Sequence, residues 1–304
     1  MMTSSSKLKT LRQVNSISLI LCTIGRLNEV DEFLKSLSLQ THKEFEVIIV
    51  DQNEHDLIDK VVRKWSKVLK IKHLKVDFIG LSRARNYGIR KASNDVLGFP
   101  DDDCRYKVNT LEKVIKFFKS KPLSSIVVGQ QVTDFKQNEH DDFISCNSPQ
   151  EISSILKLFK CKAISFLIFA KHSDLSVITG IFFDEALGLG AGTPWGSGEE
   201  TDFLIRAFRS GLKMHQCLEI KVAHSIQAKK YIECFWYGSG RYRIIEKNRL
   251  GLKIYLVNVL QPIVRMIANN DYIHLLNYCS TALGRSGIIL LFQRYYKKAL
   301  SALS

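Results

Sequence analysis

The sequence has little of several features that would fix its class directly. It contains only five prolines and 17 glycines in 304 residues, too few for a collagen-like or low-complexity chain. The seven cysteines are scattered and form no C-x-x-C pair, which argues against a zinc cluster or a disulfide framework and favours reduced thiols in a cytoplasmic protein. No Walker-type phosphate loop is present.

Long hydrophobic runs are also missing. No run reaches the ~18 apolar residues of a membrane-spanning helix, and the N-terminal stretch lacks the apolar core of a signal peptide. With 45% hydrophobic and 24% charged residues, the composition is that of an ordinary globular protein. We therefore expect a cytoplasmic protein whose contact with a membrane, if it makes one, is peripheral and on the inner face.

Positive charge is what the chain has in excess. It carries 44 Lys and Arg against 30 Asp and Glu, a net charge of +14. Residues 229–304 hold 12 of the basic and three of the acidic residues, so +9 of that charge lies in the last quarter, interleaved with Tyr, Leu and Ile. Basic and apolar residues at helical spacing favour an anionic membrane surface over a nucleic-acid groove, and we expect no nucleic-acid partner.

Apolar runs alternate with amphipathic segments over the first ~100 residues, which predicts βαβ units. The fold class expected is α/β, a doubly wound, mostly parallel sheet with helices on both faces and a helical C-terminal extension. Strands are expected at residues 17–22, 46–51, 71–76, 95–99, 125–132, 176–183 and 213–223, and helices at 29–40, 57–68, 81–92, 108–118, 199–209, 229–248 and 254–268. Residues 134–174 are expected to form an irregular insertion over the site.

Three adjacent carboxylates follow the strand expected at 95–99. In an extended segment Asp101 and Asp103 point to one side and Asp102 to the other. Two convergent carboxylates suit a hard cation, Mg²⁺ or Mn²⁺, and ligands bind beyond the carboxyl ends of parallel strands. A solvated acidic turn or a helix cap is the alternative. His224 either adds an imidazole to this metal site or has a structural role.

A second acidic cluster opens the helix expected at 199–209. Glu199, Glu200 and Asp202 either favour the helix start through its dipole or supply a general base. The glycine-rich loop before them, residues 188–198, suits a lid that approaches a ligand closely. We assign acceptor binding to Trp195 and Gly196 in this loop.

Five motifs occur in the order typical of one enzyme family. They are Cys-Thr-Ile-Gly-Arg-Leu-Asn (22–28), Ile-Ile-Val-Asp (48–51), Gly-Leu-Ser-Arg-Ala-Arg-Asn-Tyr-Gly (80–88), Phe-Pro-Asp-Asp-Asp (99–103) and Gly-Glu-Glu-Thr-Asp (198–202). Over residues 16–226 the chain resembles family 2 glycosyltransferases, and the resemblance extends weakly into residues 237–241. It implies a GT-A fold and an inverting, metal-dependent transferase that uses a nucleotide-diphosphate sugar.

The resemblance also implies roles for individual residues. Thr23 and Arg26 belong to the first nucleotide-binding loop, and Asp51 accepts a hydrogen bond from the base, usually uracil. Asp101 and Asp102 contact the nucleotide sugar, while Asp101 and Asp103 bracket the D-x-D motif that holds the metal on the diphosphate. Arg85 and Asn86 line the nucleotide pocket. Glu200 stands where the family has an Asp base. Because the residue type differs, Glu199 and Asp202 remain alternative bases.

The resemblance divides the chain as well. Residues 16–226 are the expected catalytic domain, with a nucleotide-sugar half at 16–104 and an acceptor half at 105–226, and residues 227–304 are the basic helical extension. A glycan or lipid-linked hydroxyl acceptor, as in surface polysaccharide or glycolipid synthesis, is the expected partner. A metal-dependent nucleotidyltransferase and a catalytically silent glycan-binding protein of the same fold are the alternatives.

Overall fold

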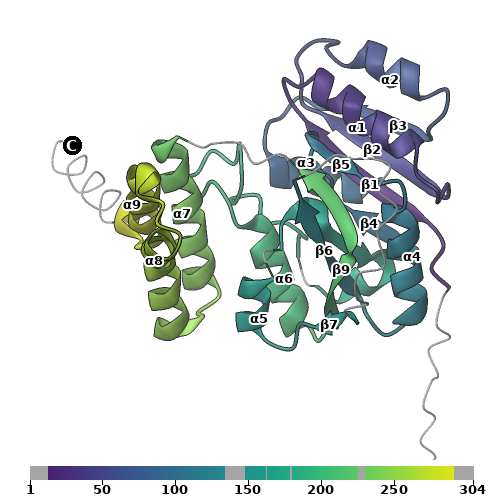
Figure 1. Ribbon diagram of the computed structural model, residues 1–304. Helices are drawn as coiled ribbons and strands as arrows, with labels where there is room; N and C mark the ends of the chain where they lie inside the picture. Colours follow the sequence, from purple (N-terminus) through teal and green to yellow (C-terminus); the bar gives the residue numbers. More distant parts are fainter. Residues whose placement is uncertain (1–12, 134–147, 162, 179, 225–229, 291–304) are drawn as a thin grey trace, which may run out of the picture.

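A computed structural model describes residues 13–133, 148–161, 163–178, 180–224 and 230–290. In these residues a single sheet holds every strand, in the order β3-β2-β1-β4-β8-β6-β9-β5, with β7 paired to β9 (Figure 1). The strands are β1 (Ile17–Thr23), β2 (Phe45–Asp51), β3 (Ile71–Lys75), β4 (Val96–Gly98), β5 (Cys104–Tyr106), β6 (Ile126–Val132), β7 (Gln150–Glu151), β8 (Ile168–Lys171) and β9 (Met214–His224).

The first half of the sheet is parallel, as expected. Strands β3, β2, β1 and β4 are joined by parallel ladders. The connecting helices are α1 (Asn28–Ser38), α2 (Asp59–Trp65) and α3 (Leu81–Ile89). The chain moves outward from β1 to β3 and then returns to β4. Because such crossovers are right-handed, α1 and α2 lie on one face of the sheet and α3 on the other, which is the doubly wound arrangement.

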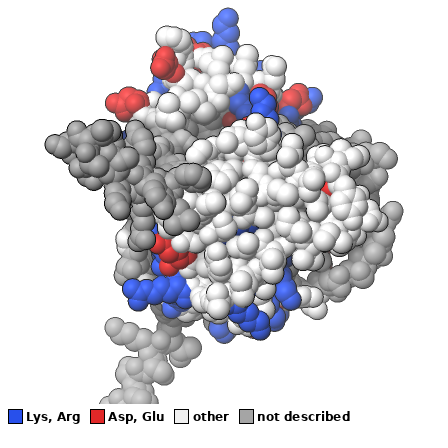
Figure 2. All heavy atoms as spheres, turned by 90° about the vertical axis from the view of Figure 1, so that its left-hand side faces the viewer, with Lys and Arg blue, Asp and Glu red and all other residues white. Residues whose placement is uncertain are grey.

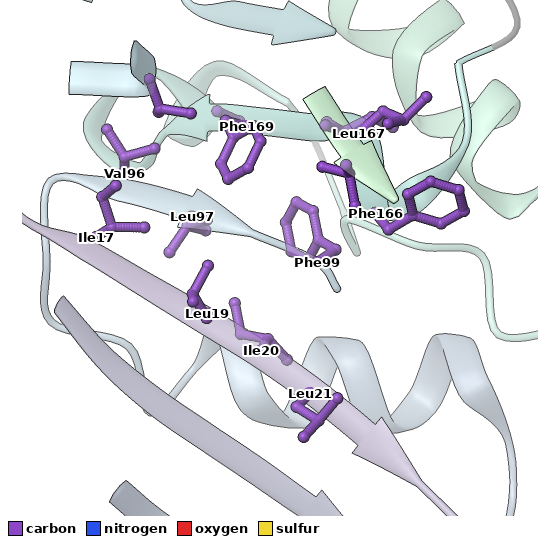
Figure 3. Packing of buried hydrophobic residues seen from close by; sticks show 14 of the residues in the cluster. Ile17, Leu19, Ile20, Leu21, Val96, Leu97, Phe99, Phe166, Leu167 and Phe169 are labelled. Carbon is purple, nitrogen blue, oxygen red and sulfur yellow. The ribbon is translucent and has the colours of Figure 1, made fainter. Parts of the chain in front are cut away.

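The core between β1, β4 and β8 is apolar and tightly packed. Figure 3 shows buried side chains of these strands, among them Leu19, Leu97, Phe99 and Phe169, each fully buried. Leu19 and Phe169 both pair with Gly98 and lie on one face of the sheet, whereas Leu97 and Phe99 lie on the other. A Cβ at Gly98 would lie 2.9 Å from both the Leu19 and the Phe169 side chains, so only glycine fits this strand position. This packing fixes the end of β4, which leads directly into the three carboxylates.

The second half of the sheet is mixed, and here one expectation is wrong. No strand forms within residues 176–178 and 180–183; instead a 3₁₀ helix, η2, spans His172–Val177. The strand in this region is β8, which pairs antiparallel with both β4 and β6 at the centre of the sheet. Its apolar run lay inside the segment expected to be irregular, and a run of four buried residues is too short for periodicity to distinguish strand from helix.

Other elements of the second half follow the expected ranges closely. Helix α4 spans Thr110–Ser120 and α6 spans Glu199–Arg209, while β6 and β9 pair in parallel. The expected insertion also contains β7, the short helix α5 (Ile155–Lys160) and the 3₁₀ turn η1 (Ser165–Leu167). Residues 134–147 of that insertion lie outside the described residues.

Three helices form a separate layer beside the sheet: α7 (Tyr231–Lys247), α8 (Gly251–Ala268) and α9 (Leu275–Arg285), with a 3₁₀ turn, η3 (Tyr272–His274), before α9 (Figure 1). Glycine lets α7 approach its neighbours. A Cβ at Gly284 would lie 2.2 Å from the Phe235 carbonyl oxygen, and a Cβ at Gly240 would lie 2.2 Å from the Ser197 carbonyl oxygen. Helix α7 is therefore held against both α9 and the glycine-rich loop.

The outer face of this layer is apolar. Figure 2 shows a broad surface of uncharged residues with lysines and arginines at its lower edge. On α8 the exposed residues at helical spacing are Leu252, Leu256, Leu260 and Val264. Helix α8 has a mean hydropathy of 1.2 over 18 residues, and by length and composition it meets the requirement for a spanning helix. The sequence analysis considered continuous apolar runs, and α8 is not one, because Lys253 and Arg265 lie within it.

Candidate functional site

Several predicted site residues lie at the carboxyl ends of β1 and β4. These neighbouring strands mark the point where the chain, after adding β2 and β3 on one side of β1, continues the sheet on the other side. Thr23 ends β1, and residues 101–103 form the turn that follows β4, its parallel neighbour. Doubly wound sheets bind ligands at this position because loops from adjacent strands diverge there and leave a crevice. The hydroxyl of Thr23 donates to Asp102 Oδ2 at 2.8 Å, which joins the two loops.

Asp101, Asp103 and His224 form a cluster of potential metal ligands. One ligand atom from each lies within 4.8 Å of the others, and His224 Nε2 is 2.9 Å from Asp103 Oδ1. The His224 ring stacks on Phe166, with 4.7 Å between ring centroids and 7° between planes, which fixes its orientation. Two carboxylates and an imidazole are a donor set that fits Mn²⁺ or Mg²⁺.

The carboxylates of this cluster differ in their electrostatics. Hydrogen bonding by His224 holds the pKa of Asp103 below its usual value, and Arg26 NH1 lies 3.0 Å from its other oxygen. Burial raises the pKa of Asp101. Burial also raises the pKa of Asp102, to about 6, although the hydrogen bond from Thr23 lowers it. Asp103 is therefore the member that stays ionised most readily.

Arg85 links this cluster to the second acidic cluster. Its side chain on α3 is 1% exposed, and its guanidinium lies 3.0 Å from Asp101 Oδ1 and 3.0 Å from Glu199 Oε1. It also donates to Ser165 Oγ at 2.7 Å. In the structure Arg85 is a buried cation between two acids, where it offsets their repulsion; the nucleotide contact that the resemblance implies for it stays a prediction.

The three acids at the start of α6 have distinct surroundings. Glu199 pairs with Arg85. Asp202 is fully buried and bound by Arg206 Nε at 2.8 Å, Lys247 Nζ at 3.0 Å and Asn248 Nδ2 at 3.0 Å, so it ties α6 to the end of α7. In the described part of the chain no other residue pairs with the Glu200 carboxylate. Burial, followed by the charge of Glu199, raises the pKa of Glu200 to about 8.

Two of the predicted residues lie outside this cluster. Asp51 accepts from the backbone and side chain of Asn53 and lies 2.9 Å from His73 Nε2; despite its burial, these contacts hold its pKa below the usual value. Asn86 donates to the Phe183 carbonyl oxygen and accepts from the Phe183 amide, so it anchors the chain after η2.

Asp51 and His73 also approach Asp59 closely enough to form a second group of potential metal ligands. Lys75 Nζ lies 3.6 Å from Asp59, so a cation of the protein already offsets charge there.

Trp195 and Gly196 lie where the glycine-rich loop meets α7. Trp195 is 8% exposed and Gly196 donates its amide to the Trp236 carbonyl oxygen at 3.2 Å. Gly188, with φ of 93°, brings the same loop against Glu199: a Cβ there would lie 2.9 Å from the carboxyl group. The loop is thus packed between the acidic helix start and α7.

Sequence reasoning missed three residues that support the site. Ser165 donates to Asp101 Oδ1 at 3.2 Å, and Phe166 stacks on His224. The signal was present: Ser165 is the single polar residue in the apolar run at 163–170. The third is Tyr237 on α7: burial, followed by the charge of Glu199, raises its pKa to about 12.

Comparison with known families agrees with this geometry. The family model described as glycosyl transferase family 2 matches residues 18–171, half of the chain. The chain belongs to glycosyl transferase family 2. The match contains the first loop, the residues around Arg85 and the three carboxylates, and it ends before the acids of α6.

Curated relatives support the same assignment. An uncharacterized glycosyltransferase of Rickettsia conorii is 33% identical over 103 residues, which cover 34% of this chain and 17% of that protein. One from Haemophilus influenzae is 27% identical over 191 residues, covering 62% of this chain and 61% of the relative. The aligned segment is thus a small part of the Rickettsia protein.

Two solved structures share the fold. The mannosyltransferase PcManGT from Pyrobaculum calidifontis, in complex with GDP-Man and Mn²⁺, superposes with a TM-score of 0.66 at 12% identity over 93% of this chain and 89% of that one. S. aureus TarS, in complex with UDP-GlcNAc, gives 0.56 at 17% identity over 81% and 66%. The chain therefore has the GT-A-like fold that the resemblance implied.

Proposed function

We propose that this glycosyltransferase moves a sugar from a nucleoside diphosphate sugar, a UDP sugar in the first instance, to an acceptor hydroxyl with inversion at the anomeric carbon. One observation carries the proposal: the ligand set of Asp101, Asp103 and His224 lies in the same site as Glu200, the unpaired acid of its helix start. The first group suits a diphosphate-bound cation and the second suits deprotonation of a hydroxyl.

The metal ligands would be Asp101, Asp103 and His224, and the ion Mn²⁺ or Mg²⁺. When bound, such an ion offsets the negative charge that develops on the leaving diphosphate. The chain's own contribution is to hold the ligands in place: Phe166 orients His224, Arg26 pairs with Asp103 and Arg85 pairs with Asp101. The structure of PcManGT with GDP-Man and Mn²⁺ supports this choice of cofactor by analogy of fold.

Glu200 would be the general base. Its raised pKa of about 8 brings it close to working pH, where a carboxylate takes a proton from a hydroxyl most effectively. Glu199 is a poorer candidate because Arg85 holds it, and Asp202 is poorer still because it faces α7. The oxygen that loses its proton to Glu200 attacks the anomeric carbon opposite the diphosphate, so one displacement inverts the configuration.

The division of the chain follows from these roles. In this proposal residues 16–104 bind the donor through Thr23, Arg26, Asp51 and the turn after β4, and residues 105–226 supply the base and the acceptor side. Asn86 acts on the pocket indirectly, through the Phe183 segment that it anchors. Trp195 and Gly196 would border the acceptor, because their loop lies against Glu199.

The acceptor we propose is a glycan or lipid-linked hydroxyl compound of surface polysaccharide or glycolipid synthesis, met at the inner face of the cytoplasmic membrane. The support is the exposed apolar side chains of α8 together with the charge of +9 in residues 229–304. A peripheral position fits better than a span, because α8 packs against both α7 and α9. Each Lys or Arg near an anionic surface contributes ~1 kcal/mol.

Titration of nucleotides into the purified protein tests the proposed function. UDP, GDP and UMP are compared with and without Mn²⁺ by calorimetry. We expect a nucleoside diphosphate to bind in a Mn²⁺-dependent manner and UMP to bind more weakly. Absence of any Mn²⁺-dependent diphosphate binding contradicts the proposal.

A further inference from the structure

A cavity of about 270 Å³ lies between α5, α7 and α8, apart from the residues assigned to the donor and the metal. Its lining is mainly apolar and includes Leu156, Phe159, Ile254 and Val257. Among these aliphatic and aromatic groups the cavity also presents polar side chains from α7 and α8. A polar group placed in an apolar cavity is costly unless it has a partner.

Asn258 is one such group. It is 3% exposed and lines the cavity from α8, yet neither its Oδ1 nor its Nδ2 has a hydrogen-bond partner among the described residues. A buried amide left without partners costs ~1–3 kcal/mol of stability. The fold carries this cost at a position where leucine or another apolar residue would fit the surroundings, which points to a ligand.

Arg241 lines the same cavity from α7. Its guanidinium lies over the Phe159 ring, 4.5 Å from the centroid, and its Nε has no hydrogen-bond partner. Arg285 of α9 lies next to it: NH1 donates to the Asn258 carbonyl oxygen, and its Nε is likewise without a partner. Arg285 NH1 also donates to Gln261 Oε1 at 3.0 Å, and the charge of Glu200 is the one carboxylate effect recorded on Arg241 among the described residues.

The electrostatics agree with this geometry. Burial lowers the pKa of Arg241, and burial followed by the charge of Arg241 lowers that of Arg285 to about 10. Two half-buried cations and a buried, unpartnered amide therefore share one region, and an anion there would offset the charge of the first two and supply a partner for the third. A phosphate group suits them because guanidinium groups and an amide Nδ2 donate to its oxygens.

The cavity also continues into the apolar face of α8. Val257 lines the cavity and is 53% exposed, and Leu256 and Leu260, its neighbours along α8, are exposed as well. A ligand with its anionic group at Arg241 thus has an apolar path for a hydrocarbon chain. On the other side, the charge of Glu200 acts on Arg241, so the anionic group would lie on the acceptor side of the site.

We propose that this cavity binds the phosphate group of an amphiphile, with Arg241 and Asn258 contacting the phosphate and the exposed residues of α8 contacting the hydrocarbon chain. The phosphate belongs either to a membrane phospholipid or to the lipid carrier of the acceptor. The assignment to the lipid carrier rests on the proposed function, whereas binding of the phosphate group in the cavity does not.

Octyl phosphate is a suitable soluble probe, titrated calorimetrically below its micelle concentration without nucleotide or metal. Octanol and inorganic phosphate are the chemical controls. The variants are Arg241→Gln and Asn258→Leu, and the matched control is Lys253→Gln, which removes a positive charge from the exposed side of α8. We expect Arg241→Gln and Asn258→Leu to weaken octyl phosphate binding by about ten-fold or more and Lys253→Gln to change it less than about two-fold.

Thermal stability separates loss of a ligand contact from loss of fold. Asn258→Leu removes an unpartnered buried amide, so its Tm should equal or exceed that of the parent while its affinity for octyl phosphate falls. Equal binding by the parent and both cavity variants overturns the proposal. So does octanol or inorganic phosphate binding as tightly as octyl phosphate.

Vesicles identify the source of the phosphate. Neutral phosphatidylcholine vesicles are doped with either phosphatidylglycerol or a polyprenyl phosphate. Arg241-dependent binding to the first assigns the site to bulk phospholipid, and Arg241-dependent binding only to the second assigns it to the acceptor's carrier. If Arg241→Gln binds both vesicles as the parent does, the proposal fails even when nucleotide binding shows the proposed function to be right.

Discussion

Arg85 and Glu199 form an ion pair of 3.0 Å across 114 residues of sequence, and the same guanidinium lies 3.0 Å from Asp101. One buried cation thus connects the turn after β4 with the start of α6. Arg85 holds Glu199, whereas the neighbouring Glu200 forms no ion pair with any residue that the structure describes. The division of labour that we propose between the two glutamates follows from this contact.

Replacing Arg85 tests the contact as a structural element. Arg85→Gln leaves Asp101 and Glu199 buried without their counter-charge, which costs about 3–5 kcal/mol. We expect a large fall in Tm, smaller at acidic pH where the carboxyl groups take up protons. Arg83→Gln is the matched control, since Arg83 is exposed on the same helix. Thermal unfolding of both variants at two pH values decides; equal Tm values would contradict the role of Arg85.

Glu200→Gln keeps the side chain's shape and removes its basicity. Turnover should fall by about 10²-fold or more while nucleotide affinity persists. Asp202→Asn serves for comparison: because Asp202 binds Arg206, Lys247 and Asn248, its loss should lower Tm in the first place. Near-normal turnover in Glu200→Gln together with inactive Glu199→Gln would move the base by one residue.

The pH dependence of turnover follows from the same residue. A base whose pKa is about 8 is protonated and inactive below that pH and active above it. The rate should therefore rise with pH on a limb centred near pH 8. The folded protein holds the Glu200 proton more tightly than the unfolded chain does, because its pKa is raised from 4.5 to about 8. The free energy of unfolding should therefore fall as pH rises between these two values, and Glu200→Gln should reduce that fall. A flat profile from pH 6 to 9 would exclude this assignment.

The close contact of α7 with α9 gives a further prediction. A Cβ at Gly284 would lie 2.2 Å from the Phe235 carbonyl oxygen, so Gly284→Ala must separate the helices. We expect a destabilisation of ~1–3 kcal/mol, measured by denaturant unfolding. Leu283→Ala alters the adjacent exposed residue of the same helix and should change little. Similar midpoints for the two variants would show that the contact is unimportant.

The sequence predicted the parallel half of the fold well because its strands are continuous apolar runs followed by polar loops. It failed at β8, whose four residues lack any period and whose strand neighbours are distant in sequence. It grouped Asp101, Asp103 and His224 because they lie at or just after strand ends; the structure places one ligand atom of each within 4.8 Å of the others, and their role as metal ligands stays a prediction. The sequence did not distinguish the role of Glu199 from that of Asp202. Their ion-pair partners lie on α3 and α7, far from them in the sequence.

Release of nucleoside diphosphate from UDP sugars is the most direct measure of the account. The parent protein should release UDP from at least one UDP sugar when Mn²⁺ is present and lose this activity in a chelator. Asp103→Ala should lose both this activity and Mn²⁺-dependent nucleotide binding while keeping the parent's circular dichroism spectrum. UDP release by Asp103→Ala at the parent's rate, or release undiminished by the chelator, would contradict metal-dependent transfer at this site.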